Sequence, residues 1–380
     1  GQLQMARQWM RAGSAATAAT KQAGIAPSLM RGDDVLVEIY YAASDSAALA
    51  GAAAGVDAAL RDAGAQAVNR LGGAAVVAWV PVSKLESLAA DKNIARISLA
   101  RRARHTATTS EAVVKTNADW WQSASFNGSG ITVALIDSYD DTLGNIAALK
   151  ASGDWPTSVT LHDFKNMAGC TGFGCAAVTH GDATMELTFD IAPSATFHAY
   201  DTWLVSDWYN AILDAANLDA NGAPLGSPKA NVISASLGAP LDSIGDGTAI
   251  PGSIAEAAGF ARANGVLVVN AAGNAGGSHW SGNGNIVLNG TNINYHQWSG
   301  TNTYNNIFTG YCVPAGVDIV LSLSWNDWAT SGGQFVSSKD YALELYYKSG
   351  TNTFTQVASS DFAQGGAPGN TPQEYIAYTT

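Results

Sequence analysis

The sequence predicts an α/β protein whose central domain is a doubly wound parallel sheet. Apolar segments of strand length alternate with amphipathic segments of helical length through the middle of the chain. Such alternation is typical of a parallel sheet that helices cover on both faces. The expected strands are 131–138, 195–201, 230–238 and 266–274, and the expected helices include 206–218 and 254–265. Segments with other patterns flank this domain and predict an α+β unit before it and an all-β module after it.

The segment before the central domain, residues 31–104, has the pattern of a ferredoxin-like α+β unit, and we call it the N-terminal unit. Strand, helix, strand, strand, helix and strand follow one another, which is the split βαβ order. The expected strands are 34–41, 66–71, 74–81 and 94–100, and the expected helices are 46–63 and 81–91. Residues 1–30 precede this unit and are predicted to form an N-terminal helical segment.

The composition of the sequence changes again near the end of the central domain, which we place at 105–284. Residues 285–380, called the β module, are rich in Asn, Gly, Thr, Ser and Trp. Short alternating segments predict strands at 318–325, 341–347, 355–360 and 374–379. This spacing favours a small antiparallel sandwich or jelly roll.

Composition excludes some functions and indicates export. The chain has 380 residues, of which 13% are charged, and a formal net charge of −12. It offers no basic face for a polyanion, so a nucleic acid partner is not expected. No apolar run reaches the 18 residues that suggest a membrane span. Low charge with many small polar and aromatic residues is typical of secreted bacterial proteins, so we expect an extracellular or periplasmic protein whose leader is absent from this chain.

The three cysteines indicate a disulfide rather than a metal site. Cys170 and Cys175, in "CTGFGC", are candidates for a small disulfide loop in an exported protein, which leaves Cys312 unpaired. The alternative is three free thiols. Cys-x4-Cys without further Cys or suitably spaced His is poor zinc spacing, so no metal site is predicted.

Three polar residues occupy positions where α/β proteins place reactive groups. Asp137 ends an apolar strand, His180 begins an apolar helix after a turn, and Asn274 follows another strand in "AAGN". Reactive groups in parallel sheets gather at the carboxyl ends of the strands. The sequence therefore predicts that Asp137 and Asn274 lie at this edge of the sheet, and His180 falls between them in chain order.

With their surroundings, these motifs resemble those of the subtilisin-like serine proteases, the subtilase family. "GSGITVALIDS" is similar to their aspartate segment and "HGDATMELTFDIAPSA" to their histidine helix. "VISASLG" is similar to their substrate-lining strand, and "GVLVVNAAGN" to the segment that carries the oxyanion asparagine. The resemblance extends over nearly everything from about residue 31.

The resemblance implies a role for each residue in the hydrolysis of a polypeptide substrate. His180 would be the general base and then the general acid, and Asp137 would orient it and stabilise its cation. Asn274 would donate to the oxyanion of the tetrahedral intermediate. Backbone hydrogen bonds would hold the substrate chain along the cleft. The residues expected to line that cleft are Ser236, Leu237, Gly238, Ala271, Ala272 and Gly273. Calcium sites are common in the family, but Asp140-Asp141 is too little for a ligand loop, so no cofactor is predicted.

The flanking units also resemble parts of this family. The N-terminal unit is similar to the inhibitory, chaperone-like propeptide, which implies that it acts as an intramolecular inhibitor of a precursor. The linker at 101–112 would then hold the maturation cleavage, and Arg101-Arg102-Ala103-Arg104 is either that cleavage site or a solvated linker. The β module resembles the jelly-roll modules that some bacterial members carry.

The sequence departs from the family pattern at three places. Asp137-Ser138-Tyr139 replaces Asp-Ser/Thr-Gly, and Asp182 replaces a small Ser or Thr in the histidine motif. The Gly-Thr-Ser-x-Ala-x-Pro segment with the nucleophilic serine is absent from these residues. We expect the chain to be the amino-terminal part of a longer protease, with the β module inserted before a missing C-terminal catalytic portion. The same absence would also fit a fragment that stays associated with its remainder, or a pseudoprotease.

Two further alternatives remain. Glu186 and Asp190 share a helix face and could form an acid pair like that of the sedolisin proteases. Aligning "AP" at 192–193, however, places the sedolisin acids near His180 and Thr184, so the imidazole mechanism is preferred. In the second alternative, the protein is not a catalyst, and its β module binds a polysaccharide or protein surface through exposed Trp and Tyr side chains. Trp325 and Trp328 are expected instead to pack the sandwich or its rim.

Overall fold

The structure is a computed structural model, and it describes most of the chain. The described residues are 25, 29–43, 46–100, 104–105, 112–239, 250–284, 286–288, 294–298, 300, 302–308, 312–350 and 353–380. The helical segment predicted for residues 1–30 lies almost entirely outside these ranges. So does most of the linker at 101–112, including Arg101 and Arg102 of its arginine cluster.

The N-terminal unit is an antiparallel sheet with helices. Its strands pair in the order β5–β2–β4–β3, and the short β1 continues the edge beside β2. The first predicted helix is present, whereas the second is a 3₁₀ turn followed by a short α-helix. The elements are β1 (Met30–Arg31), β2 (Asp34–Tyr41), α3 (Ser46–Asp62), β3 (Gln66–Leu71), β4 (Ala75–Pro81), η2 (Val82–Lys84), α4 (Leu85–Ala89) and β5 (Ile94–Leu99).

The predicted parallel sheet is confirmed, with one more strand than expected. Five parallel strands pair in the order β12–β10–β7–β9–β8. Four of them match the predicted segments, and β8 is additional. The strands are β7 (Thr132–Asp137), β8 (Val159–Asp163), β9 (Thr196–Asp201), β10 (Val232–Ala235) and β12 (Leu267–Asn270).

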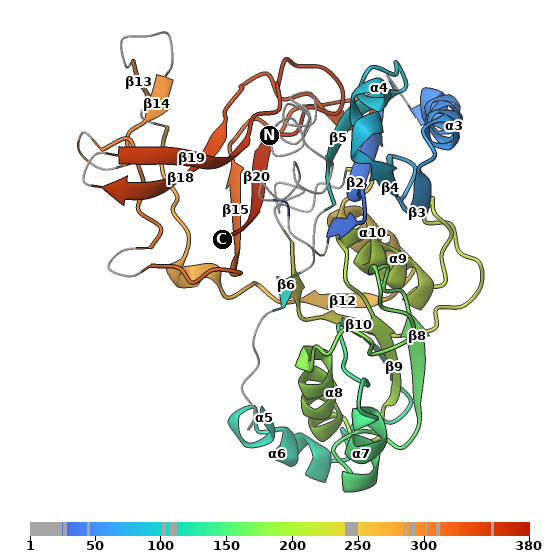
Figure 1. Ribbon diagram of the computed structural model, residues 1–380. Coiled ribbons are helices and arrows are strands. Elements are labelled where there is room, and N and C mark those ends of the chain that lie inside the picture. The colour runs from blue at the N-terminus through green and yellow to red at the C-terminus, as the bar shows by residue number, and fades with distance from the viewer. Residues whose placement is uncertain are drawn as a thin grey trace.

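Helices cover both faces of this sheet, as a doubly wound arrangement requires (Figure 1). Successive side chains of a strand point to opposite faces. On β7, Ala134 and Ile136 join the core that contains α9 and α10, while Val133 and Leu135 join the core that contains α7 and α8. The helices of this domain are α5 (Ala112–Lys115), α6 (Ala118–Ser123), α7 (Asn145–Ser152), α8 (His180–Ile191), α9 (Val205–Ala215) and α10 (Ile254–Ala263).

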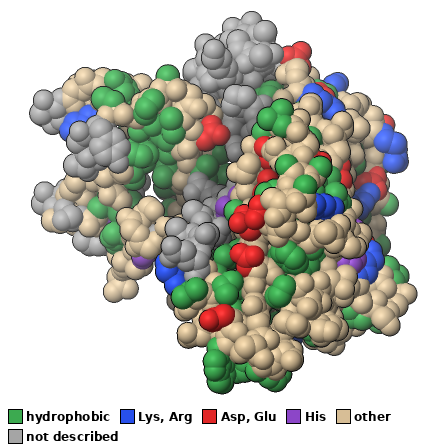
Figure 2. All heavy atoms as spheres, turned by 90° about the horizontal axis from the view of Figure 1, so that it is seen from below, with side chains coloured by type: hydrophobic (Ala, Val, Ile, Leu, Met, Phe, Trp, Pro, Cys, Tyr) green, Lys and Arg blue, Asp and Glu red, His purple; other side chains and the backbone are tan. Residues whose placement is uncertain are grey.

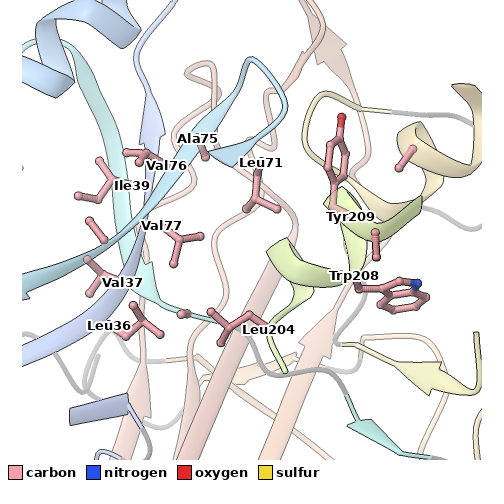
Figure 3. Close-up of a cluster of buried hydrophobic side chains, with 14 of the residues drawn as sticks. Leu36, Val37, Ile39, Leu71, Ala75, Val76, Val77, Leu204, Trp208 and Tyr209 are labelled. Carbon is pink, nitrogen blue, oxygen red and sulfur yellow. The ribbon is translucent and has the colours of Figure 1, made fainter. Parts of the chain in front are cut away.

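The N-terminal unit packs on the α9 side of the parallel sheet. A single cluster of buried apolar side chains runs from β2 and β4 through Leu71 to Leu204, Trp208 and Tyr209 (Figure 3). Polar contacts border this cluster: Asn210 Nδ2 donates to Asn69 Oδ1 at 2.7 Å. The two units therefore share one core.

The β module consists of small antiparallel sheets, in agreement with the predicted all-β character. β15 (Asp318–Ser324) pairs with β20 (Gln373–Thr379), and β18 (Leu343–Gly350) pairs with β19 (Thr353–Ser360). Ile319, Leu345, Ala358 and Ile376 form a small core between them. The remaining short elements are η3 (Ala275–Gly277), β13 (Ile286–Leu288), β14 (Asn294–His296), β16 (Thr330–Ser331) and β17 (Gln334–Phe335).

The surface agrees with the charge pattern of the sequence. On the face in Figure 2, Lys and Arg side chains are scattered among neutral and acidic ones and form no continuous patch. Among the helices that the structure describes, none has both the length and the apolar character needed to cross a bilayer.

Candidate active site

The structure brings Asp137 and His180 into direct contact. Asp137 is the last residue of β7 and His180 is the first residue of α8. His180 Nδ1 lies 2.8 Å from Asp137 Oδ1 and 2.9 Å from Asp137 Oδ2. The aspartate is 1% exposed and the imidazole 12% exposed. Because a carboxylate accepts hydrogen bonds, the proton of a neutral imidazole lies on Nδ1, and Nε2 is left as the basic nitrogen.

Both oxygens of Asp137 receive further donors. The Ser138 N–H donates to Oδ1 at 2.8 Å, and the Thr184 hydroxyl donates to Oδ2 at 3.1 Å. Hydrogen bonds to the charged form of a carboxyl group favour ionisation. Thr184 is four residues after His180 and thus on the same face of α8, so its position followed from helical periodicity although its role was not predicted.

Gly181 lets α8 approach the end of β7. Its N–H donates to the Ser138 carbonyl oxygen at 2.7 Å. A Cβ atom at this position would lie 2.6 Å from that oxygen and 2.7 Å from the Tyr139 ring. The glycine after the histidine is therefore required by close packing rather than by an unusual backbone angle.

Side-chain hydrogen bonds stabilise the turn after Asp137, in which Tyr139 stands where the family pattern has glycine. Tyr139 is fully buried, and its hydroxyl donates to the Leu135 carbonyl oxygen at 3.1 Å. Burial raises the pKa of this phenol well above its usual value, so it remains protonated. The Ser138 hydroxyl donates to the carbonyl oxygen of Thr202. Both side chains of Ser138-Tyr139 therefore anchor the turn.

Asp182, the other departure in the histidine motif, is also buried. Its Oδ2 accepts the Asp140 N–H at 3.2 Å. Burial, together with the neighbouring carboxylates Asp140 and Asp137, raises the pKa of Asp182 to about 7 against the opposing effect of that hydrogen bond. The charge expected next to His180 is thus only partly present at neutral pH.

The remaining predicted residues lie at the same edge of the sheet, after the neighbouring strand β10 and after β12, the next strand beyond it. The segment Ala271–Asn274 follows β12, and Ser236 links β10 to the short strand β11 (Leu237–Gly238). The two segments are joined, because Asn270 Nδ2 donates to the Leu237 carbonyl oxygen at 3.4 Å and the Ala271 N–H donates to the Ala235 carbonyl oxygen at 3.0 Å. Asn274 is exposed, and no hydrogen bond within the described residues links it to Asp137 or His180.

The chain itself pairs with the segment predicted to bind substrate. β6 (Arg104–His105) forms an antiparallel ladder with β11, with His105 opposite Leu237 and Arg104 opposite Gly238. Arg104 is the last residue of the N-terminal unit and His105 the first residue after it. A strand from the same chain therefore occupies the backbone edge of Leu237–Gly238.

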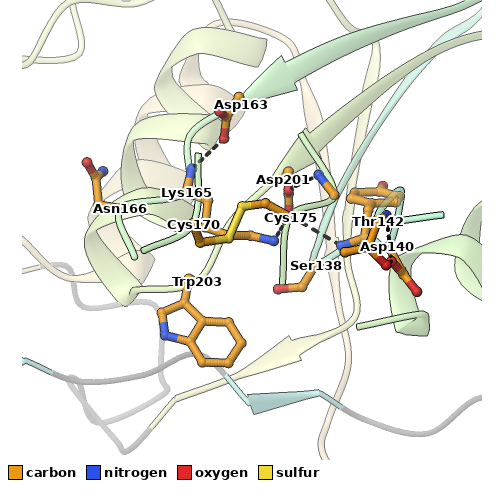
Figure 4. Close-up of a disulfide and its surroundings, with 12 residues drawn as sticks. Ser138, Asp140, Thr142, Asp163, Lys165, Asn166, Cys170, Cys175, Asp201 and Trp203 are labelled. Carbon is orange, nitrogen blue, oxygen red and sulfur yellow. Dashed lines mark hydrogen bonds and ion pairs between the residues drawn. A yellow bond between two sulfur atoms is a disulfide. The ribbon is translucent and has the colours of Figure 1, made fainter. Parts of the chain in front are cut away.

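Cys170 and Cys175 form a disulfide beside the site, and Cys312 is an exposed free thiol (Figure 4). The acid pair considered as an alternative lies farther along α8, where Glu186 is half-buried and Asp190 is exposed. Among the described residues, no three His, Cys, Asp or Glu side chains are grouped in a way that could hold a metal ion.

No protein-family profile and no curated protein sequence matches the chain. The solved structures that match include, at 16% identity, the epidermin leader peptide processing serine protease (EpiP) from Staphylococcus aureus and a mutant of the same enzyme. The TM-scores are 0.40 and 0.41, over 64% and 63% of this chain. The matches span 60% and 61% of those chains. This is a distant resemblance to a subtilisin-like serine protease, and any functional assignment rests on the site itself.

Proposed function

We propose that this chain is the precursor form of a secreted subtilisin-like serine endopeptidase. The observation that carries the proposal is the contact of His180 Nδ1 with both oxygens of the buried Asp137 at the carboxyl edge of the parallel sheet. An imidazole held through Nδ1 by an ionised carboxylate can remove a proton through Nε2 and is stabilised as the cation that results. The substrate would be a polypeptide.

The catalytic cycle follows from these positions. Nε2 of His180 would take the proton of a serine hydroxyl as that oxygen attacks the scissile carbonyl carbon, and would then return the proton to the leaving amine. Asn274 is proposed to donate to the oxyanion. The serine is proposed to come from a C-terminal catalytic portion outside the 380 residues, because its motif is absent from them.

The N-terminal unit is proposed to be the intramolecular inhibitor. A substrate chain binds a protease cleft by adding an extended strand to an exposed backbone edge. The pairing of β6 with Leu237–Gly238 supports the proposal, since the strand at the end of the N-terminal unit already uses this edge. Maturation would require cleavage in the following linker and release of this strand. The β module is proposed to be a jelly-roll insert.

The full-length gene product tests the assignment through labelling of its activated serine by a fluorophosphonate probe. We expect labelling after the N-terminal unit has been removed, and a loss on the order of 10⁴-fold in the labelling rate in His180→Ala. His279→Ala is the control, because this histidine is exposed and outside the site; labelling of that variant is expected to match the parent. Absence of labelling in the matured parent protein would refute the proposal.

A further inference from the structure

A second buried carboxylate lies beside Asp137. Asp201 is the last residue of β9, and the parallel pairing of β7 with β9 places it directly opposite Asp137. It is completely buried. The proposed mechanism does not use Asp201. Burial of a charged carboxylate costs free energy, so its presence in the protein interior requires another explanation.

Asp201 joins three segments that are distant in sequence (Figure 4). Its Oδ1 accepts the Tyr139 N–H at 3.3 Å, and its Oδ2 accepts the Gly174 N–H at 2.7 Å. Lys165 Nζ lies 2.8 Å from Oδ1, and both charged side chains are wholly buried. Burial raises the pKa of Asp201, while Lys165 and the two N–H donors oppose that effect. A buried ion pair of this kind adds little to stability compared with apolar residues, so a role in fixing geometry is the better account of it.

The geometry that Asp201 fixes is that of the Asp137 turn. Thr202, the next residue, donates its N–H to the Asp137 carbonyl oxygen at 2.8 Å and its hydroxyl to the same atom at 3.1 Å. In return, the Ser138 hydroxyl donates to the Thr202 carbonyl oxygen. With the bond from Tyr139, these contacts tie residues 137–139 to 201–202 along their whole length.

The disulfide loop completes the arrangement. Gly174, which donates to Asp201, precedes Cys175, and its carbonyl oxygen accepts the Asp141 N–H at 2.9 Å. Gly174 has a positive φ of 73°, and a Cβ there would lie 2.4 Å from Asp141 N. The Cys170–Cys175 bond thus holds a loop that contacts both Asp201 and the segment just after Tyr139.

We infer that Asp201 is a positioning residue that holds Asp137 in register with His180, and that the Cys170–Cys175 disulfide keeps its Gly174 donor in place. The inference rests on the proposed function of the Asp137–His180 pair. Its test uses a signal of that pair and needs no proteolysis, so it applies to the chain as it stands.

The proton between His180 Nδ1 and Asp137 should give a strongly downfield proton NMR signal in the parent protein. We expect this signal to broaden or disappear in Asp201→Asn, because an amide has one acceptor oxygen for two N–H donors. The double variant Asp201→Asn with Lys165→Met restores charge balance. It should recover thermal stability while the signal stays altered. Spectra are recorded well below the melting temperature of each variant. If Asp201→Asn does not fold, the double variant is compared with the parent instead.

Asp207→Asn is the matched control. Asp207 is equally buried, and in the described part of the chain its hydrogen-bond donors are Asn69, Asn166, Trp203 and Leu204 rather than residues of the Asp137 turn. It should lose stability and keep the parent signal. An unchanged signal in the Asp201 variants, or an equal change in Asp207→Asn, would overturn the inference. Absence of the signal from the parent itself would instead count against the proposed function.

Reduction of the disulfide tests the second part. In a Cys312→Ser background, a reducing agent acts on the Cys170–Cys175 bond alone, and we expect the downfield signal to broaden. A signal that is unchanged after complete reduction, verified by mass after thiol alkylation, would refute a role for the disulfide.

Discussion

Two carboxylates near His180 experience opposite surroundings. Asp137 receives donors on both oxygens in addition to the imidazole, whereas Asp182 receives one N–H at 3.2 Å. Its Oδ1 is buried and has no hydrogen-bond partner in the described part of the chain. Environments that separate the protonation of neighbouring acids are typical of catalytic sites. Here they favour a charged Asp137 beside a partly protonated Asp182.

This difference predicts a pH-dependent contribution to stability from Asp182. Its pKa of about 7 in the folded protein lies above the ordinary aspartate value of 3.8, so folding favours the protonated form. Its stabilising contribution is therefore complete below about pH 4 and is lost as the pH rises through 7. Asp182→Asn should match the parent near pH 4 and exceed its free energy of unfolding by at most about 4 kcal/mol at pH 8, since the pKa is raised by about three units and each unit corresponds to about 1.4 kcal/mol. Urea unfolding at pH 4, 6 and 8 measures this.

Asp190→Asn provides the comparison on the same helix. Asp190 is exposed, so removal of its charge should leave the pH profile of the parent unchanged. If Asp182→Asn and the parent lost stability in parallel between pH 4 and pH 8, the buried carboxyl group would not be the source of the dependence.

Among the elements, α8 has the packing that depends most on a single residue, Gly181. Gly181→Ala would push a methyl group against the Ser138 carbonyl oxygen and the Tyr139 ring, so α8 must move away from β7. Overpacking of this kind costs about 1–3 kcal/mol. Gly259 in α10 has open space around its missing Cβ, so Gly259→Ala should instead stabilise the protein by about 0.5–1 kcal/mol. Urea unfolding of the two variants should move in opposite directions, and a Gly181→Ala variant as stable as Gly259→Ala would contradict this account.

The elements that sequence predicted well are those whose pattern is set by burial. β2 and β3 were predicted at their observed bounds, and the four apolar strands of the parallel sheet were found within a few residues. β8 was missed because its "VTLHD" is half-exposed at the edge of the sheet and lacks an apolar run. α7 was missed because its eight residues carry no amphipathic pattern.

Only the site residues that stand in a local sequence pattern could be predicted. Asp137 and His180 stand at the ends of strongly patterned elements, and the Gly after His180 is a local signal. Thr202 and Asp201 contact the Asp137 turn through strand pairing over more than sixty residues, which no local pattern reveals. Arg104 and His105 likewise meet Leu237–Gly238 only through the docking of a whole unit.

At the scale of the molecule, that docking uses both apolar and polar contacts. Leu71 lies in the shared core beside Gly252, and Asn210 Nδ2 of α9 donates to Asn69 Oδ1 of β3 at 2.7 Å. On the other side, Arg96 Nη1 donates to Thr371 Oγ1 of the β module at 2.7 Å. The N-terminal unit therefore contacts both other parts of the chain without needing the linker at 101–112.

These contacts predict that the N-terminal unit stays bound after the linker is cut. With a specific protease site placed within 106–111, the two pieces of the cleaved protein should elute together in gel filtration at micromolar concentration. Leu71→Ala should release the unit, because truncation of a buried leucine costs about 2–5 kcal/mol and each 1.4 kcal/mol is a tenfold change in Kd. Leu60→Ala is the control: this buried leucine lies on α3, which packs on β2 and β3 of the same unit. It should lower the stability of the unit while the pieces remain together. Separation of the parent pieces, or equal release by both variants, would mean that the shared core does not hold the N-terminal unit in place.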